Sequence, residues 1–234
     1  MGIRTSHKTL TAAVVLVVAA AGTAALLHPE TQVGLRADTT APTTMAQWQT
    51  RVLDAATRNA PTVASNRVTA SAYDDQLTKL PAENFADATS AEAVFGEGED
   101  RSWSVFIGPA VDPPRVDVCD RALRYVVLNC SAASGPATGD LTVQTVILTI
   151  KRPGIANTDM YEARTDALAV ARRNPSRVRF EQTVRLFRAG GSLSQVTETV
   201  YGTNDLNPAS AFAIPPSALT ALAADPSLNV DLDG

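Results

Sequence analysis

The residue types that carry most hydrolytic chemistry are scarce in this chain. Its two histidines are His7 and His28, so the sequence after residue 28 contains none. A Ser-His-Asp triad, a Cys-His pair and a zinc site of the H-E-x-x-H type all need an imidazole, which excludes them from the later part of the chain. The lysines that follow the first 41 residues are Lys79 and Lys151, and neither lies three residues after a serine, so the S-x-x-K pattern of a Ser-Lys nucleophile is also absent.

Carboxylates are the remaining groups that could catalyse hydrolysis. The densest group is Glu97, Glu99 and Asp100. Neighbouring carboxylates can act as the acid and base of a glycosidase or bind Ca²⁺ through oxygen. The spacing here matches no EF-hand loop, and only 5% of the residues are aromatic, which argues against a sugar-binding cleft. We therefore interpret this group as a mobile acidic loop, and we assign no catalytic residue, no metal ligand and no cofactor.

Basic charge is concentrated in one part of the chain. Residues 151–188 contain nine basic and four acidic side chains, whereas residues 189–234 contain five acidic side chains and no lysine or arginine. The alternating pattern over 177–188 predicts a strand, with three arginines on one of its faces: Arg177, Arg179 and Arg185.

Two interpretations of these arginines stay open. The first is a solvated face, partly neutralised by the acidic segment that follows it. The second is an anion-binding face that contacts a wall polymer, a lipid headgroup or an acidic protein loop. Glu181 interrupts the row, which favours the first interpretation.

The two cysteines, Cys119 and Cys130, are spaced C-x10-C. An even pair in an oxidising compartment usually forms a disulfide bond, whereas a redox-active pair usually has the closer C-x-x-C spacing. We therefore predict a structural Cys119–Cys130 disulfide bond.

The N-terminus has the layout of an export signal. Residues 1–9 carry basic and no acidic side chains, and residues 10–27 carry no charge. A helix of 18 residues is about 27 Å long, close to the roughly 30 Å hydrocarbon core of a membrane. Small residues near the end of the apolar run also allow cleavage by signal peptidase. We predict a cytoplasmic stub (1–9), a signal anchor or signal peptide (10–27), a tether (28–41) and a single extracytoplasmic domain (42–234).

Helices are predicted in four places within that domain. Thr44 and Gln47 form a capping-box pattern at the start of a helix over 45–59. Further helices are expected around 90–95, over 160–173 with Asp159 and Glu162 as its capping pair, and over 215–224.

Strands are predicted between these helices, in segments rich in β-branched and apolar residues: 102–107, 123–130, 141–151 and 177–188. The segment 141–151 is apolar on both faces near its middle, which predicts a central strand. A hairpin follows 177–188. A three-residue loop, Ala189-Gly190-Gly191, pairs Val184 with Val196 and Phe180 with Val200, whereas a two-residue loop would spoil this apolar match.

Together these elements predict an α+β fold: an antiparallel sheet with helices packed on one face, preceded by one N-terminal transmembrane or signal helix. The composition agrees with a globular domain. A hydrophobic fraction of 45% is too high for a disordered chain, and a net charge of −4 is unlike that of nucleic-acid binders.

Arginine outnumbers lysine 17 to 3, and one apolar segment precedes the domain. With the closing stretch from Phe212 to Pro226, these features resemble single-anchor exported proteins of high-GC Gram-positive bacteria. The resemblance implies no activity and no site residue. We expect a non-enzymatic module at the cell membrane, with its C-terminal domain outside, or secreted if the signal is cleaved. It would bind an envelope protein or an anionic wall polymer. The alternatives are a carboxylate-dependent wall hydrolase and the outer domain of a sensory membrane complex.

Overall fold

The computed structural model describes residues 42–61, 68–96, 100–110, 114, 116–122, 126–135, 139–152, 161–202 and 207–229. The predicted stub, membrane segment and tether lie outside these residues. None of the helices that the structure describes is long and apolar enough to cross a membrane.

The described residues form a nine-stranded antiparallel sheet. Eight strands follow the order β2-β1-β3-β4-β9-β8-β6-β5, and β7 pairs with β6. The strands are β1 (Val68–Tyr73), β2 (Lys79–Leu80), β3 (Ser90–Gly96), β4 (Arg101–Pro109), β5 (Val127–Ser134), β6 (Leu141–Lys151), β7 (Tyr161–Glu162), β8 (Val178–Phe187) and β9 (Ser192–Tyr201). The mainly antiparallel α+β class predicted from the sequence is confirmed.

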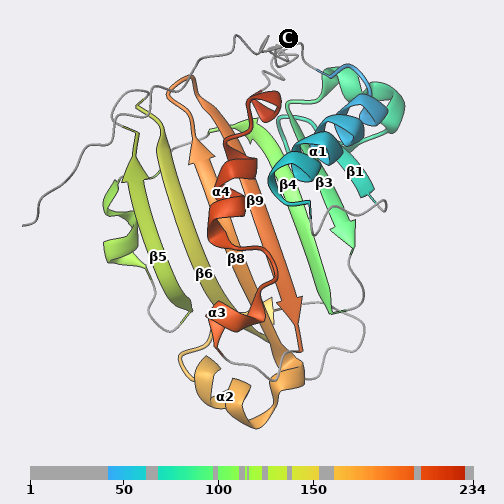
Figure 1. Cartoon of the computed structure of the whole chain (residues 1–234). Coiled ribbons are helices and arrows are strands. Elements are labelled where there is room, and N and C mark those ends of the chain that lie inside the picture. Colours follow the sequence, from blue (N-terminus) through green and yellow to red (C-terminus); the bar gives the residue numbers. More distant parts are fainter. Residues whose placement is uncertain are drawn as a thin grey trace, which may run out of the picture. The chain divides into compact units, whose positions relative to one another are not determined.

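The two longest helices lie across one face of this sheet, α4 over β8 and β9, and α1 over the strands at the β1 end (Figure 1). The helices are α1 (Met45–Asn59), α2 (Ala167–Arg173), α3 (Pro208–Ala211) and α4 (Pro216–Ala223), and the 3₁₀ turns are η1 (Ala82–Asp87), η2 (Val116–Arg121), η3 (Pro175–Arg177) and η4 (Pro226–Leu228). We call the sheet face under α1 and α4 the covered face and the opposite one the open face.

Helix α1 forms where the sequence predicts it. The Thr44 hydroxyl accepts a hydrogen bond from the Gln47 amide, and the Gln47 side chain accepts one from the Thr44 amide. This capping box satisfies two backbone donors that have no partner within the helix. Trp48 and Val52 are fully buried against the sheet. The prediction for 45–59 is therefore confirmed.

The main core lies between the covered face and these helices. Alternating residues of β3 and β4 point into it, and the rings of Phe95 and Trp103 stack with their centroids 3.7 Å apart. Leu219 and Leu222 of α4 complete the cluster. Burial of this apolar surface is the main force that holds the helices on the sheet.

The β8–β9 hairpin also forms as predicted, with Val184 opposite Val196 and Phe180 opposite Val200. The Arg188 amide donates to the Ser192 carbonyl, which leaves residues 189–191 as the loop. Gly191 has a φ of 88°, a conformation that glycine adopts without strain. The three-residue loop is confirmed.

One predicted helix is wrong, and another is shorter than predicted. The segment around 90–95 is strand β3, because Ala91, Ala93 and Phe95 alternate into the core and the strand pairs with β1 and β4 on its two sides. Helix α2 covers only 167–173 of the predicted 160–173, because Tyr161 and Glu162 pair with the end of β6 instead.

The other predicted elements are confirmed with shifts at their ends. Strand β6 spans 141–151 as predicted, but it is the second strand from the sheet edge rather than a central one. The strand predicted over 123–130 is described from 127 to 134. Helix α4 matches the predicted 215–224 to within one residue at each end.

The open face also carries a helical element. Val118 of η2 packs against Leu141, Val143 and Phe187, which point away from the covered face. The 3₁₀ turn η2 thus covers the β5–β6 end of the open face, where the sequence placed no helix.

Candidate functional site

The centre of the open face is lined by hydroxyl groups. Successive strand partners Ser104, Thr197, Thr183 and Thr145 form one row across β4, β9, β8 and β6. They share this face because side chains alternate along each strand, so that the residues between them point to the covered face. The Thr183 and Thr197 hydroxyl oxygens lie 3.2 Å apart, within hydrogen-bond distance.

A hollow of about 270 Å³ lies on this face over β3, β4, β9 and β8. Most of its lining residues carry hydroxyl, carboxylate or amide groups, and Val94 and Trp103 add apolar surface: Glu92, Val94, Ser102, Trp103, Ser104, Glu181, Gln195, Thr197 and Thr199. These positions lie on paired strands, so the hollow has a fixed framework with several hydrogen-bond donors and acceptors.

Of the three arginines predicted on one strand face, the structure places two there. Arg179 and Arg185 lie on the open face of β8, with Glu181 between them, as the alternation predicts. Arg177 belongs to η3, and its guanidinium donates two hydrogen bonds to the Lys151 carbonyl. It therefore holds the chain beside β6 rather than extending the arginine row.

Arg179 is engaged by its neighbours. Its guanidinium pairs with Glu181 at 3.1 Å, donates to the Thr149 hydroxyl at 3.2 Å and lies 4.6 Å from the centre of the Tyr161 ring. The Tyr161 ring in turn contacts that of Tyr201, with centroids 5.8 Å apart. This end of the open face is thus aromatic and cationic, with the charge of Arg179 offset by Glu181.

The carboxylates of the hollow are too far apart for a glycosidase pair. In the sheet register Glu92 and Arg185 lie in the same row, three strands apart. Glu181 lies four residues from Arg185 along β8. Strand spacing and rise place the Glu92 and Glu181 Cα atoms on the order of 19 Å apart. Glycosidases need their two carboxyl groups within roughly 5–9.5 Å. Glu92 and Glu181 do not meet that requirement.

The acidic group predicted as a loop is described only at Asp100, which is exposed; Glu97 and Glu99 lie outside the described residues. Among the residues that the structure describes, no three histidine, cysteine or acidic side chains come together as metal ligands.

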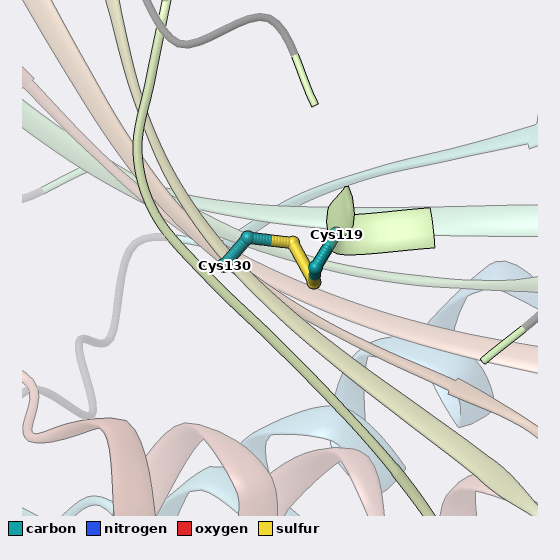
Figure 2. The surroundings of a disulfide bond; sticks show 2 residues. All are labelled: Cys119 and Cys130. Atoms are coloured by element: carbon teal, nitrogen blue, oxygen red, sulfur yellow. A yellow bond between two sulfur atoms is a disulfide. The ribbon is translucent and has the colours of Figure 1, made fainter. Parts of the chain in front are cut away.

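The predicted disulfide bond between Cys119 and Cys130 is present, with their Cα atoms 5.4 Å apart. It links η2 to β5 (Figure 2). Cys130 pairs in register with Thr145, whose side chain lies on the open face. The bond therefore fixes the element that covers one end of the open face.

On the covered face, a buried carboxylate joins the C-terminal segment to the sheet. Glu198 is fully buried and accepts hydrogen bonds from Arg101 (2.9 Å), Gln182 (2.8 Å) and the amides of Ala213 (2.8 Å) and Ile214 (3.0 Å). Because every one of these donors belongs to the protein, we interpret Glu198 as a structural residue. The sequence carries one signal for it, an acidic residue at the apolar position between Val196 and Val200.

A second carboxylate joins α1 to the turn η4. Asp225 accepts hydrogen bonds from Arg58, Asn59 and Ser227 at distances from 2.6 to 3.2 Å. Burial by itself raises the pKa of Asp225, but these hydrogen bonds outweigh it and hold the pKa below its ordinary value.

A comparison of the chain with known protein families, curated proteins and solved structures finds no match. The function is therefore inferred from the site alone.

Proposed function

We propose that the protein is a non-enzymatic binding module of the cell envelope, held outside the cell by residues 10–27, or secreted if that segment is cleaved. The open face would bind a polyhydroxylated component of the cell wall. The observation that carries this proposal is the hollow, where hydroxyl, amide and carboxylate groups on four paired strands face solvent together.

The chemistry of the lining favours a ligand rich in hydroxyl groups. Serine and threonine both donate and accept hydrogen bonds, while glutamate accepts them and glutamine does both. A sugar or polyol offers the same mixture of donors and acceptors. Polar groups make up most of the lining, so hydrogen bonds would contribute most of the binding.

A hydrolase is the less favoured function. The two carboxylates of the hollow lie far apart in the register, and Glu181 is paired with Arg179. No feature of the described residues favours the sensory alternative.

The binding proposal can be tested with Thr197→Val, which keeps the shape of the side chain and removes its hydroxyl. Thr142→Val is a matched control, because Thr142 pairs with Leu186 and lies on the other side of the same sheet. Loss of one hydrogen-bonding hydroxyl is expected to weaken binding to purified wall polysaccharide roughly three- to tenfold. The control should bind like the unmodified chain. Equal binding by all three proteins, or binding by none, would contradict the proposal.

The location is tested separately. Fusion of a reporter enzyme that is active only outside the cytoplasm to the C-terminus of the full chain should give activity, and deletion of residues 10–27 should abolish it.

A further inference from the structure

Arg185 differs from Arg179, the other arginine on the open face of β8, in the partner that its guanidinium group contacts. It lies on β8 opposite Gln195 of β9, and its Nε donates a hydrogen bond of 2.7 Å to the Gln195 side-chain carbonyl. Within the described part of the chain, no carboxylate pairs with it. Several other arginines do pair with carboxylates: Arg58, Arg101, Arg121, Arg164 and Arg179.

The surroundings of Arg185 leave its charge only weakly compensated. Its neighbours on the open face are Thr183, Val143 and Phe187. Burial lowers the pKa of Arg185, and the charge of Glu181, four residues away along β8, opposes this effect. An arginine stays protonated in proteins, so this is a half-buried cation that has lost part of its hydration. An external anion would replace the missing interaction.

Gln195 connects this cation to the hollow. Its side chain is part of the lining, and while its carbonyl accepts from Arg185 its amide nitrogen lies 3.4 Å from the Thr197 hydroxyl. The hydrogen bond that Nε donates orients the guanidinium group. Within the described residues no partner is found for its two Nη atoms, which could form the two-pronged contact that suits a carboxylate or phosphate.

The geometry points to Arg185, held by Gln195, as an anion subsite at the edge of the hollow, so that the ligand is an acidic glycan carrying a carboxylate or phosphate group. This inference rests on the proposed function, in which the hydroxyl groups of the same ligand meet Ser104, Thr197 and Thr199. The nearby acid Glu181 does not oppose it, because Arg179 offsets its charge.

The test measures binding of the full chain, in mild detergent, to three polymers at about 0.15 M salt, where long-range attraction is screened. The polymers are alginate fragments, which carry carboxylates, poly(glycerol phosphate), which carries phosphodiesters, and dextran fragments, which are neutral. The unmodified chain should bind one of the acidic polymers at least about tenfold more tightly than dextran, since a charge-assisted hydrogen bond is worth about that factor or more. The preferred polymer identifies the source of the anion.

Three variants distinguish a site from general charge attraction. Arg185→Gln should lose the preference for the acidic polymer and keep dextran binding. Gln195→Glu keeps the arginine but gives it an internal carboxylate, so it should lose the same preference. Arg172→Gln, at an exposed arginine on α2, is the control and should keep it. Circular dichroism checks that each variant is folded.

The outcomes separate the two ideas. Equal binding of the acidic and neutral polymers by the unmodified chain would overturn the anion subsite and leave the proposed function standing. An equal loss in Arg185→Gln and Arg172→Gln would also overturn the subsite. Binding of none of the three polymers would overturn both.

Discussion

Replacing Glu198 by alanine tests how the C-terminal segment is held on the sheet. The change removes the acceptor for four donors, one of which is the Arg101 guanidinium group. Removing one partner of a buried, hydrogen-bonded ion pair costs about 3–5 kcal/mol. Arg101 remains partly exposed and keeps its hydrogen bond to the Ala211 carbonyl, so we expect a loss within that range rather than the sum of four separate bonds.

This loss is large compared with the stability of a typical domain, about 5–15 kcal/mol. Urea unfolding followed by circular dichroism should show a lower midpoint, and the melting temperature should fall by about 6–20 °C, given about 2–4 °C per kcal/mol for a chain of this size. The Ala213 and Ile214 amides, which donate to Glu198, should also lose protection from hydrogen exchange.

Two further variants serve as references. Glu92→Ala removes a carboxylate from the open face, where its neighbour is the Tyr73 hydroxyl at 3.5 Å, and should change stability by less than about 0.5 kcal/mol. Glu198→Gln keeps the volume and one acceptor oxygen, so its loss should be intermediate. A loss below about 1 kcal/mol in Glu198→Ala, or one equal to that of Glu92→Ala, would refute the reasoning.

Three other predictions concern pH, the disulfide bond and the hairpin loop. Because the pKa of Asp225 is lower in the folded than in the unfolded protein, its ionised carboxylate stabilises the folded state. This stabilisation is fully present above the unfolded pKa of about 3.9 and is lost as the pH falls through the folded pKa. Thermal melts should show this loss of stability in acid, and Asp225→Asn should reduce the loss. Replacing Cys119 and Cys130 by serine should lower the unfolding free energy by about 2–3 kcal/mol in urea titrations, and a stability that reductant leaves unchanged would contradict a structural bond. Gly191→Ala should cost about 1–2 kcal/mol because of its positive φ, whereas Gly190→Ala, where an added Cβ meets nothing, should be nearly neutral; equal melting temperatures would argue against the loop geometry.

The elements predicted correctly are those with a local physical signal. Helix α1 carries its own capping box, and the β8–β9 register follows from the positions of Val184 and Val196 relative to two glycines. The cysteine spacing was sufficient to predict the disulfide bond. In each of these cases the determining residues lie close together in the sequence.

The errors arose where distant parts of the chain decide the structure. Residues 90–96 have the composition of a helix, but pairing with β1 and β4 makes them a strand. Tyr161 fits a helical face with Leu168, yet it pairs with β6 and Leu168 is exposed. Propensity is a weak guide when a neighbouring strand offers its hydrogen bonds.

The candidate site was predicted in part for the same reason. The alternation around Arg179 and Arg185 placed both on one strand face, as the structure has them. The hollow forms because β3, β4 and β9 lie next to one another in the sheet. The residue pattern within one strand does not predict which strands will be its neighbours. Likewise, Gln195 becomes a partner of Arg185 only through the register of the hairpin.

The position of β9 has a consequence for when the protein folds. Among the strands that the structure describes, this one lies between β4 and β8, and it alone joins the N-terminal strands to the rest of the sheet. A ribosome must therefore make most of the chain before the two halves can meet. Such long-range closure slows folding. If residues 10–27 direct export as predicted, the delay means that the chain is still unfolded when it reaches the translocation machinery and can pass through it.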